Sequence, residues 1–210
     1  MKLFFCDLET TGLDPEKHGI HQMSGCLMVD GKIVEEFNWN MRPPSGVGLS
    51  CSPEALKVTG KTMDMLLSYP PESEQYRNLL AMLGRHIDKR NRADKAYWVG
   101  YNANFDVGFA RKMFERQEDK FFGSWFWSAP VLDLMPLLGF VFPGLRPRML
   151  NFKLGSVAAE LGIKPSGELH DAKVDIDLCV ELFKLIVAEL GPAGVARWFS
   201  EMNGALKKAA

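Results

Sequence analysis

The sequence has no paired-cysteine pattern, no excess of either charge and no long uninterrupted apolar run. Its four cysteines show no Cys-x-x-Cys spacing, which is typical of reduced cysteines in the core of a cytoplasmic protein. The net charge of −1 creates no global basic field, so any binding of nucleic acid must rely on local groups. The apolar stretch 130–145 is interrupted by Asp133 and by prolines, so we expect no membrane span. One lysine and a few apolar residues lead into the first acidic motif, and we expect no secretory signal.

What is present is the composition of an ordinary globular protein, with 47% hydrophobic and 24% charged residues in a chain of 210. No repeat, low-complexity tract or linker divides the chain, so we expect a single domain over 1–210, with 192–210 as a C-terminal helix or tail. The basic run 85–95 is most simply a solvated helix end and loop.

Apolar runs and turn signals predict strands that come first and then alternate with helices. We expect strands at the N-terminus and at 20–29, 32–41, 96–101 and 130–134, with Asp30-Gly31 as a hairpin turn. We expect helices at 53–58 (capped by Ser52), 72–90, 104–117, 153–161, 171–190 and 192–207. This order predicts an α/β fold around a mixed β-sheet flanked by helices.

Two carboxylates stand at the end of the first predicted strand. Because side chains alternate between the faces of a strand, Asp7 and Glu9 follow apolar residues on the same face. Buried carboxylates are costly unless their charge is neutralised, and a hard divalent cation is a suitable partner. Alone, the pair is equally consistent with the start of a solvated loop.

Two further acids interrupt apolar stripes of predicted helices. Asp106 shares a stripe with Phe109 and Ala110, three and four residues further on, although an acid in a first turn also stabilises the helix dipole. Asp175 interrupts the apolar face of the helix predicted from residue 171. His170 can approach Asp175 if it lies in the loop before that helix, although it is also consistent with a surface histidine.

The joint pattern is more specific than its parts. Three separate segments place acids where apolar residues belong, and four carboxylates brought together would repel one another strongly. Two divalent cations would balance that charge, and ligands that are all oxygen favour Mg²⁺ or Mn²⁺.

These segments resemble, in order, the three motifs of the DEDD family of 3′–5′ exonucleases, in its histidine-containing branch (DEDDh). Asp7–Gly12 matches the first motif, Asn102–Asp106 the second, and His170 with Asp175 the third. The segment 53–60 is also similar to one in the proofreading subunit of bacterial replicative polymerase. Two positions depart from the pattern, because Tyr101 and Thr59 stand where relatives have histidine, which bears on substrate preference.

The resemblance implies a ribonuclease H-like fold and stepwise hydrolysis from the 3′ end of single-stranded DNA or RNA, with DNA slightly favoured, releasing nucleoside 5′-monophosphates. It implies that two Mg²⁺ or Mn²⁺ ions are bound by Asp7, Glu9, Asp106 and Asp175, and that His170 is the general base. These five residues form the implied catalytic group. It implies substrate contacts at Thr10, Thr11, Gly12, Leu13, Val58 and Phe105.

Several alternatives stay open from the sequence alone. The chain could work as a proofreading or repair subunit bound to a polymerase, with 192–207 as a docking helix, or as a homodimer. It could also be a nucleic-acid-binding module without catalysis. The aromatic cluster 121–127 is expected to pack in the core or in a subunit contact, with stacking of unpaired bases as the alternative.

Overall fold

The structure is a computed structural model that describes residues 1–46, 50–167 and 171–208, with the backbone alone for 192–208. The strands lie in the order β3-β2-β1-β4-β5. They are β1 (Lys2–Thr10), β2 (Ile20–Val29), β3 (Lys32–Asn40), β4 (Ala96–Gly100) and β5 (Leu132–Asp133). The helices are α1 (Pro53–Thr59), α2 (Met63–Ser68), α3 (Glu72–His86), α4 (Ala103–Arg116), α5 (Phe122–Trp125), α6 (Leu134–Val141), η1 (Arg146–Arg148), α7 (Leu154–Glu160) and α8 (Ala172–Lys208).

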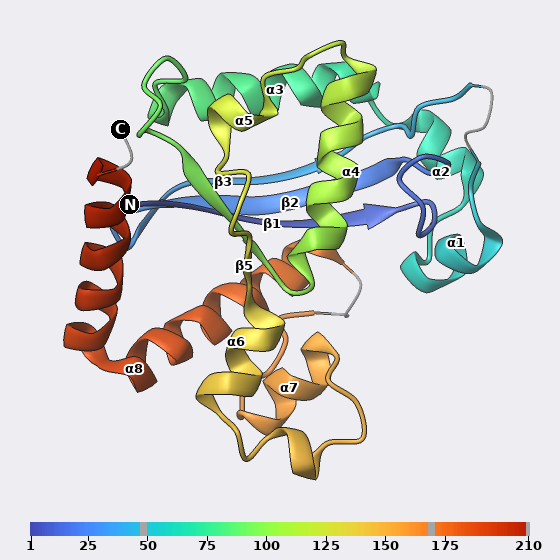
Figure 1. Ribbon diagram of the computed structural model, residues 1–210. Helices are drawn as coiled ribbons and strands as arrows, with labels where there is room; N and C mark the ends of the chain where they lie inside the picture. The colour runs from blue at the N-terminus through green and yellow to red at the C-terminus, as the bar shows by residue number, and fades with distance from the viewer. Residues whose placement is uncertain (47–49, 168–170, 209–210) are drawn as a thin grey trace.

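Strand β1 occupies the centre of the sheet, between β2 (antiparallel) and β4 (parallel). Helices α3, α4 and α5 cover one face of the sheet, and α6, α7 and α8 cover the other (Figure 1). Successive side chains of β1 point to opposite faces of the sheet and so contribute to both layers. Phe4 and Cys6 belong to one hydrophobic core, and Leu3 and Phe5 belong to the other. The predicted mixed sheet flanked by helices is confirmed.

Local turn and cap signals also act as predicted. Asp30 (φ 49°) and Gly31 (φ 83°) both adopt the left-handed conformation that a tight hairpin turn between β2 and β3 requires. Ser52 caps α1, since its side chain accepts a hydrogen bond from the Ala55 N–H, and Pro53 follows at the first helical position.

Two predicted elements differ from the structure by more than one residue at an end. Helix α3 ends at His86 instead of residue 90, because Ile87 is extended and the following loop is closed by the Asp88 N–H, which donates to Asp94 (2.9 Å). The strand expected at 130–134 shortens to β5, since Asp133 accepts from the Met135 N–H and so begins α6. The two helices expected at 171–190 and 192–207 are both present within α8, because the chain leaves the helical conformation at Gly191 (φ 72°, ψ 154°).

Four short elements were not predicted: α2, α5, α6 and η1. Helix α6 has the sequence Leu-Met-Pro-Leu-Leu-Gly-Phe-Val, which is apolar on every side. Such a segment has no helical period to detect.

The aromatic cluster belongs mainly to the core. Phe122, Trp125 and Phe126 are buried in the layer under α3 and α4, whereas Phe121 is 64% exposed. Core packing, one of the two favoured interpretations of this cluster, is therefore correct for these three residues. Cys6, Cys26 and Cys179 are buried free thiols and Cys51 is a half-buried one.

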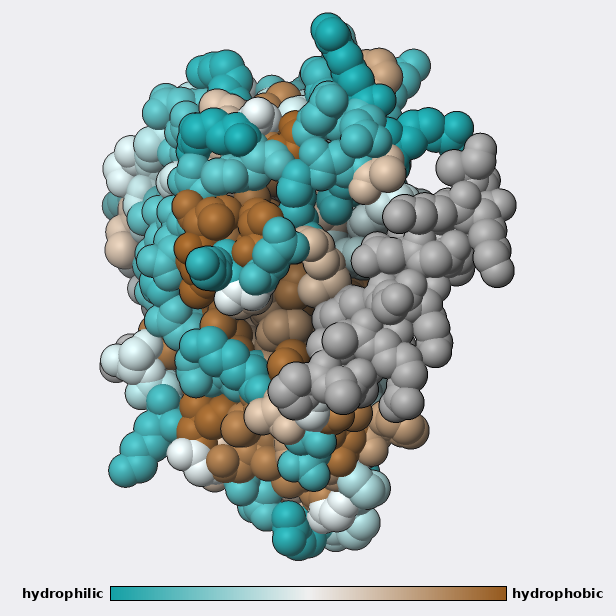
Figure 2. Space-filling model, turned by 90° about the vertical axis from the view of Figure 1, so that its left-hand side faces the viewer, coloured by the Kyte–Doolittle hydropathy of each residue, from teal (hydrophilic) through white to brown (hydrophobic). Residues whose placement is uncertain are grey.

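One face of the molecule exposes apolar atoms near its lower end. Figure 2 shows hydrophobic residues at the height of α6 and α7 and also higher on the same face. Phe140, which belongs to α6, is 80% exposed. Among the helices of the described ranges, none combines the length and the apolar character that a membrane crossing needs.

Candidate active site

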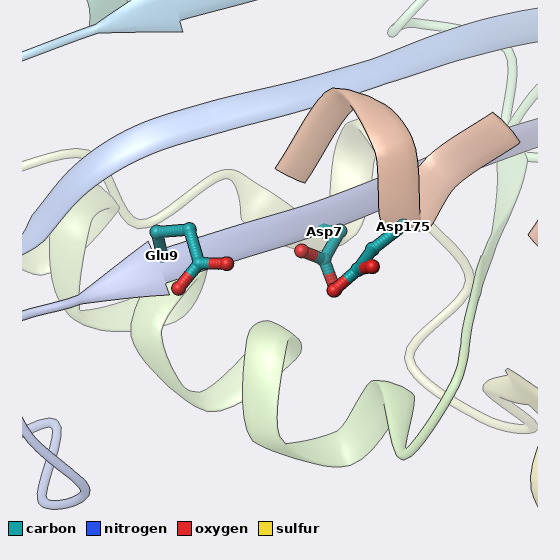
Figure 3. A group of neighbouring side chains, drawn as sticks. All are labelled: Asp7, Glu9 and Asp175. Carbon is teal, nitrogen blue, oxygen red and sulfur yellow. The ribbon is translucent and has the colours of Figure 1, made fainter. Parts of the chain in front are cut away.

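Three carboxylates from two distant parts of the chain converge near the end of β1 (Figure 3). One oxygen atom from each of Asp7, Glu9 and Asp175 lies within 4.8 Å of the other two. Asp7 and Glu9 point from the same face of β1, and Asp175 comes from the first turn of α8. The structure thus brings together three of the four acids that the sequence analysis assigned to a metal site.

The fourth acid, Asp106, lies beside this cluster in the first turn of α4. Asp106 as a whole is only 3% exposed, and its Oδ1 accepts a hydrogen bond from the Leu8 N–H at 3.0 Å. This bond reaches the backbone of β1 between the two acids of that strand. As predicted, Asp106 shares its helical stripe with the fully buried Phe109 and Ala110.

The backbone adopts an unusual conformation just before α4. Asn102 stands at the N-cap position with φ 62°, but its side chain makes no capping hydrogen bond. Its N–H donates instead to Asp133 Oδ1 at 2.9 Å, which ties the start of α4 to the end of β5.

Asp171 caps the start of α8, because its Oδ1 accepts a hydrogen bond from the Lys173 N–H at 2.9 Å. The same oxygen lies 3.3 Å from Nε2 of Gln22, the residue paired with Glu9 across the sheet. His170, the predicted general base, lies outside the described residues, so its role stays a prediction.

Burial and mutual repulsion raise the pKa values of Asp7, Glu9 and Asp106 above those of ordinary carboxyl groups. Burial raises the pKa of Asp7, and the charges of Asp175 and Asp171 raise it further. Burial and then Asp7 raise the pKa of Glu9 to about 9, while Lys61 opposes that shift. Burial also raises the pKa of Asp106, with Asp7 as the next cause. This concentration of carboxylate oxygens has the donor chemistry that a hard divalent cation requires.

A cavity of about 610 Å³ opens next to Glu9. Its walls come from the end of β1, the loop that follows, helix α1 and the first turn of α4. Five of the six residues that the sequence analysis assigned to substrate contacts line it: Thr10, Gly12, Leu13, Val58 and Phe105. The cavity therefore places apolar side chains directly beside an acidic cluster.

A family model described as Exonuclease (RNase_T) matches residues 4–183 of this chain. The chain belongs to this exonuclease family. The match extends from the first acidic strand into α8 and so includes all four predicted acids and His170. The prediction of an enzyme of the nuclease class is therefore confirmed.

Two relatives by sequence and one solved structure illustrate the similarity. The exonuclease is 29% identical to the DNA polymerase III subunit epsilon of Aquifex aeolicus, over 88% of this chain and 79% of that protein. It is 27% identical to the PolC-type DNA polymerase III of Thermotoga petrophila over 91% of this chain, but spans only 12% of that polymerase. E. coli exonuclease I, solved with a dT13 oligonucleotide, is 20% identical with a TM-score of 0.71, over 95% of this chain and 43% of that one. The fold is therefore the predicted ribonuclease H-like one.

Thr11, the sixth predicted contact residue of the exonuclease, occupies a different place. Its side chain is fully buried, donates to the Ser50 carbonyl and accepts from the Gly19 N–H, both at 3.0 Å. Thr11 thus holds together the loops that shape the cavity.

Two residues near the site were not assigned to it from the sequence. His18 lines the cavity of the exonuclease, and a Cβ added to Gly12 would come within 2.3 Å of its ring, which explains the glycine there. Lys61 follows the C-cap of α1, and its positive charge acts on Glu9. No spacing or periodicity marks either residue, because both reach the site through loops.

Glu9→Gln is expected to stabilise the metal-free exonuclease at alkaline pH. The pKa of Glu9 is about 9 in the folded chain, against about 4.3 for an unfolded glutamate, so the folded state keeps a proton that the unfolded state has lost. The linked stability is complete below about pH 4 and is lost as the pH rises through about 9. In EDTA we expect the melting temperature of the variant near pH 9 to exceed the native value by roughly 3–10 °C.

Circular dichroism melts over a pH series test this expectation. Glu54→Gln is the matched control, because Glu54 lines the same cavity but is exposed and bound to Ser52. Parallel pH profiles for the native enzyme and Glu9→Gln would contradict the expected linkage.

Proposed function

We propose that this chain is a divalent-metal-dependent 3′–5′ exonuclease that releases nucleoside 5′-monophosphates one at a time from single-stranded DNA. The observation that carries the proposal is the convergence of Asp7, Glu9 and Asp175 beside a cavity with apolar walls. In this proposal the exonuclease domain comprises residues 1–210, with 192–210 as its C-terminal helix and tail.

The acidic cluster fits Mg²⁺, with Mn²⁺ as the alternative, because its ligands are all carboxylate oxygens. Asp7, Glu9 and Asp175 would hold the cations directly. Asp106 would contribute through the oxygen that the Leu8 N–H does not use. When bound, a pair of such cations lowers the pKa of a water molecule and stabilises the negative charge that develops on a phosphodiester during in-line displacement.

The cavity would receive the 3′-terminal nucleoside. Phe105 stands at the start of α4 with its ring 5.0 Å from that of Phe109, so its orientation is supported by the core. Stacking of a base on an aromatic ring contributes about 1–3 kcal/mol. Leu13 and Val58, which are 84% and 58% exposed, provide an apolar surface for the base and the sugar.

The chemical step in this proposal is attack by water on the last phosphodiester. A bond forms between the water oxygen and phosphorus, and the bond from phosphorus to the 3′ oxygen of the preceding nucleotide breaks. His170 accepts the proton of the water, since an imidazole titrates near neutral pH. The released nucleotide keeps its phosphate on the 5′ oxygen, and the 3′ oxygen left on the strand takes a proton from solvent.

We expect the purified chain to shorten a 5′-labelled oligonucleotide in single-nucleotide steps when Mg²⁺ is present, and to stop when EDTA is added. The reason is that four clustered carboxylates repel the phosphodiester unless cations compensate their charge. Gel electrophoresis of the products tests the polarity, and matched DNA and RNA strands test the choice of sugar. Binding without cleavage in Mg²⁺ and Mn²⁺ would favour a non-catalytic module instead.

A polymerase-associated proofreading role is the second candidate. The observation that favours it is the similarity to the epsilon subunit of Aquifex aeolicus, which extends over 79% of that protein. Copurification of the tagged chain with a replicative polymerase from its own cells tests this role. Purification of the active chain alone, or as a homodimer, would favour a free-standing enzyme.

A further inference from the structure

We propose that the turn Arg146–Lys153, named here the arginine turn, binds the single DNA strand on the 5′ side of the scissile phosphate. The inference rests on the proposed function and adds to it a second contact with the substrate, outside the acidic cluster and the cavity. Charge, exposed apolar surface and position in the fold support it independently.

The charge of this region fits a polyanion. No Asp or Glu occurs between Asp133 and Glu160, whereas Arg146, Arg148 and Lys153 are all cationic. The guanidinium of Arg148 lies 3.3 Å from Glu160, with side chains that are 65% and 39% exposed. An exposed ion pair of this kind contributes little to stability, so Arg148 can exchange Glu160 for a phosphate at small cost.

The arginine turn also offers apolar surface to unpaired bases. Leu150 is fully exposed at 102% of its reference area. The guanidinium of Arg146 lies 5.7 Å from the centre of the Phe152 ring, and its Nη1 donates to the Met149 carbonyl. Exposed apolar groups next to cations suit a single strand, whose bases are accessible, better than a duplex, whose bases are stacked inside.

The arginine turn is anchored at the same end of the sheet as the acids. The Tyr101 hydroxyl donates to the Phe152 carbonyl, and Tyr101 directly follows β4, the parallel neighbour of β1. The turn leads into α7, which packs against α8, the helix that carries Asp175. In Figure 1, α7 lies below the sheet near the start of α8, and α1 lies at the right-hand end of the sheet.

This placement defines a path for the strand. The cavity adjoins Glu9 on the α1 side of the cluster, whereas the arginine turn belongs to the layer of Asp175. A strand whose 3′-terminal nucleoside fills the cavity and whose last phosphodiester lies over the acids therefore continues toward the arginine turn.

The test uses the full chain with both Arg146→Glu and Arg148→Glu. The kinetics of this double variant are measured with two substrates. One substrate is an oligothymidylate of about 20 nucleotides, and the other is the p-nitrophenyl ester of thymidine 5′-monophosphate, which has no upstream strand. We expect KM for the oligonucleotide to rise about tenfold or more, with kcat and the ester kinetics within about twofold of native. The slope of log KM against log salt should fall by about 1.4, which is 0.7 for each of two lost phosphate contacts.

A matched control carries the same charge change at the opposite end of the sheet. Lys89→Glu with Arg90→Glu alters a groove beside Trp125, near the start of β1, where Lys2 binds the His86 carbonyl. This variant should leave KM for the oligonucleotide unchanged. An unchanged KM in the Arg146/Arg148 variant, or an equal loss on both substrates, would overturn the inference.

The two proposals fail in different ways. Loss of the proposed function would appear as a native chain that cleaves neither substrate. In that case, fluorescence anisotropy with labelled oligothymidylate in EDTA still tests the arginine turn. Weaker binding by the Arg146/Arg148 variant than by the Lys89/Arg90 variant supports the contact, and equal binding by the two variants overturns it.

Discussion

Asp7→Ala is expected to lower the rate of oligonucleotide cleavage by at least about 10³-fold while the chain remains folded. Asp7 lies between Glu9 and Asp175 in the cluster, so its removal takes a carboxylate from the centre of the proposed metal site (Figure 3). Metal assistance is worth several kcal/mol at the transition state, and each 1.4 kcal/mol is a factor of ten in rate. Single-turnover cleavage at saturating Mg²⁺ measures the effect.

The folded state should tolerate this change because Asp7 is strained electrostatically in the metal-free protein. Burial and the nearby Asp175 and Asp171 raise its pKa, so its charged form is disfavoured there. Thermal melts in EDTA should show the variant as stable as the native chain or more so. Asp177→Ala is the control. Asp177 lies on α8, is 42% exposed and forms an ion pair with Lys173 of that helix. Native activity in Asp7→Ala would place the chemistry elsewhere.

His170→Ala is expected to lower kcat by about 10²–10⁴-fold, the usual contribution of a general base. A histidine titrates near pH 6.5, so the native rate should rise with pH through that region. The variant should lose that rise, because no other group is assigned to take the proton of the attacking water. Initial rates over a pH series at saturating Mg²⁺ measure both effects.

His86→Ala provides a matched histidine deletion for comparison. His86 lies at the far end of the sheet, where Nε2 is 3.2 Å from Glu35. It should leave the pH profile of kcat unchanged. A His170→Ala enzyme with native kcat would remove this histidine from the mechanism.

The acidic cluster could be predicted because each acid violates a local periodicity. Asp7 and Glu9 end an apolar face of β1, Asp106 interrupts the buried stripe of α4, and Asp175 that of α8. Strand alternation and helical spacing are properties of neighbouring residues, so they are visible in sequence. The order of the three segments then identified the family that the comparisons confirm.

Features that depend on distant loops could not be predicted in the same way. The buried Thr11 forms hydrogen bonds with Gly19 and Ser50, and the charge of Lys61, which follows α1, acts on Glu9. These positions are set by tertiary packing, and no local period records them. Helix α6 escaped prediction for a related reason, because its uniformly apolar sequence has no polar face.

Helix α1 has no buried residue, although it forms a wall of the cavity. Its start is held to the loop after β1 by the Ser52 N–H, which donates to the Thr11 carbonyl at 2.6 Å. The acids, in contrast, stand on the sheet and on helices packed against it. Under the proposed function, selectivity for the terminal nucleotide would therefore change during evolution through substitutions in this thin wall, while the acidic cluster is preserved.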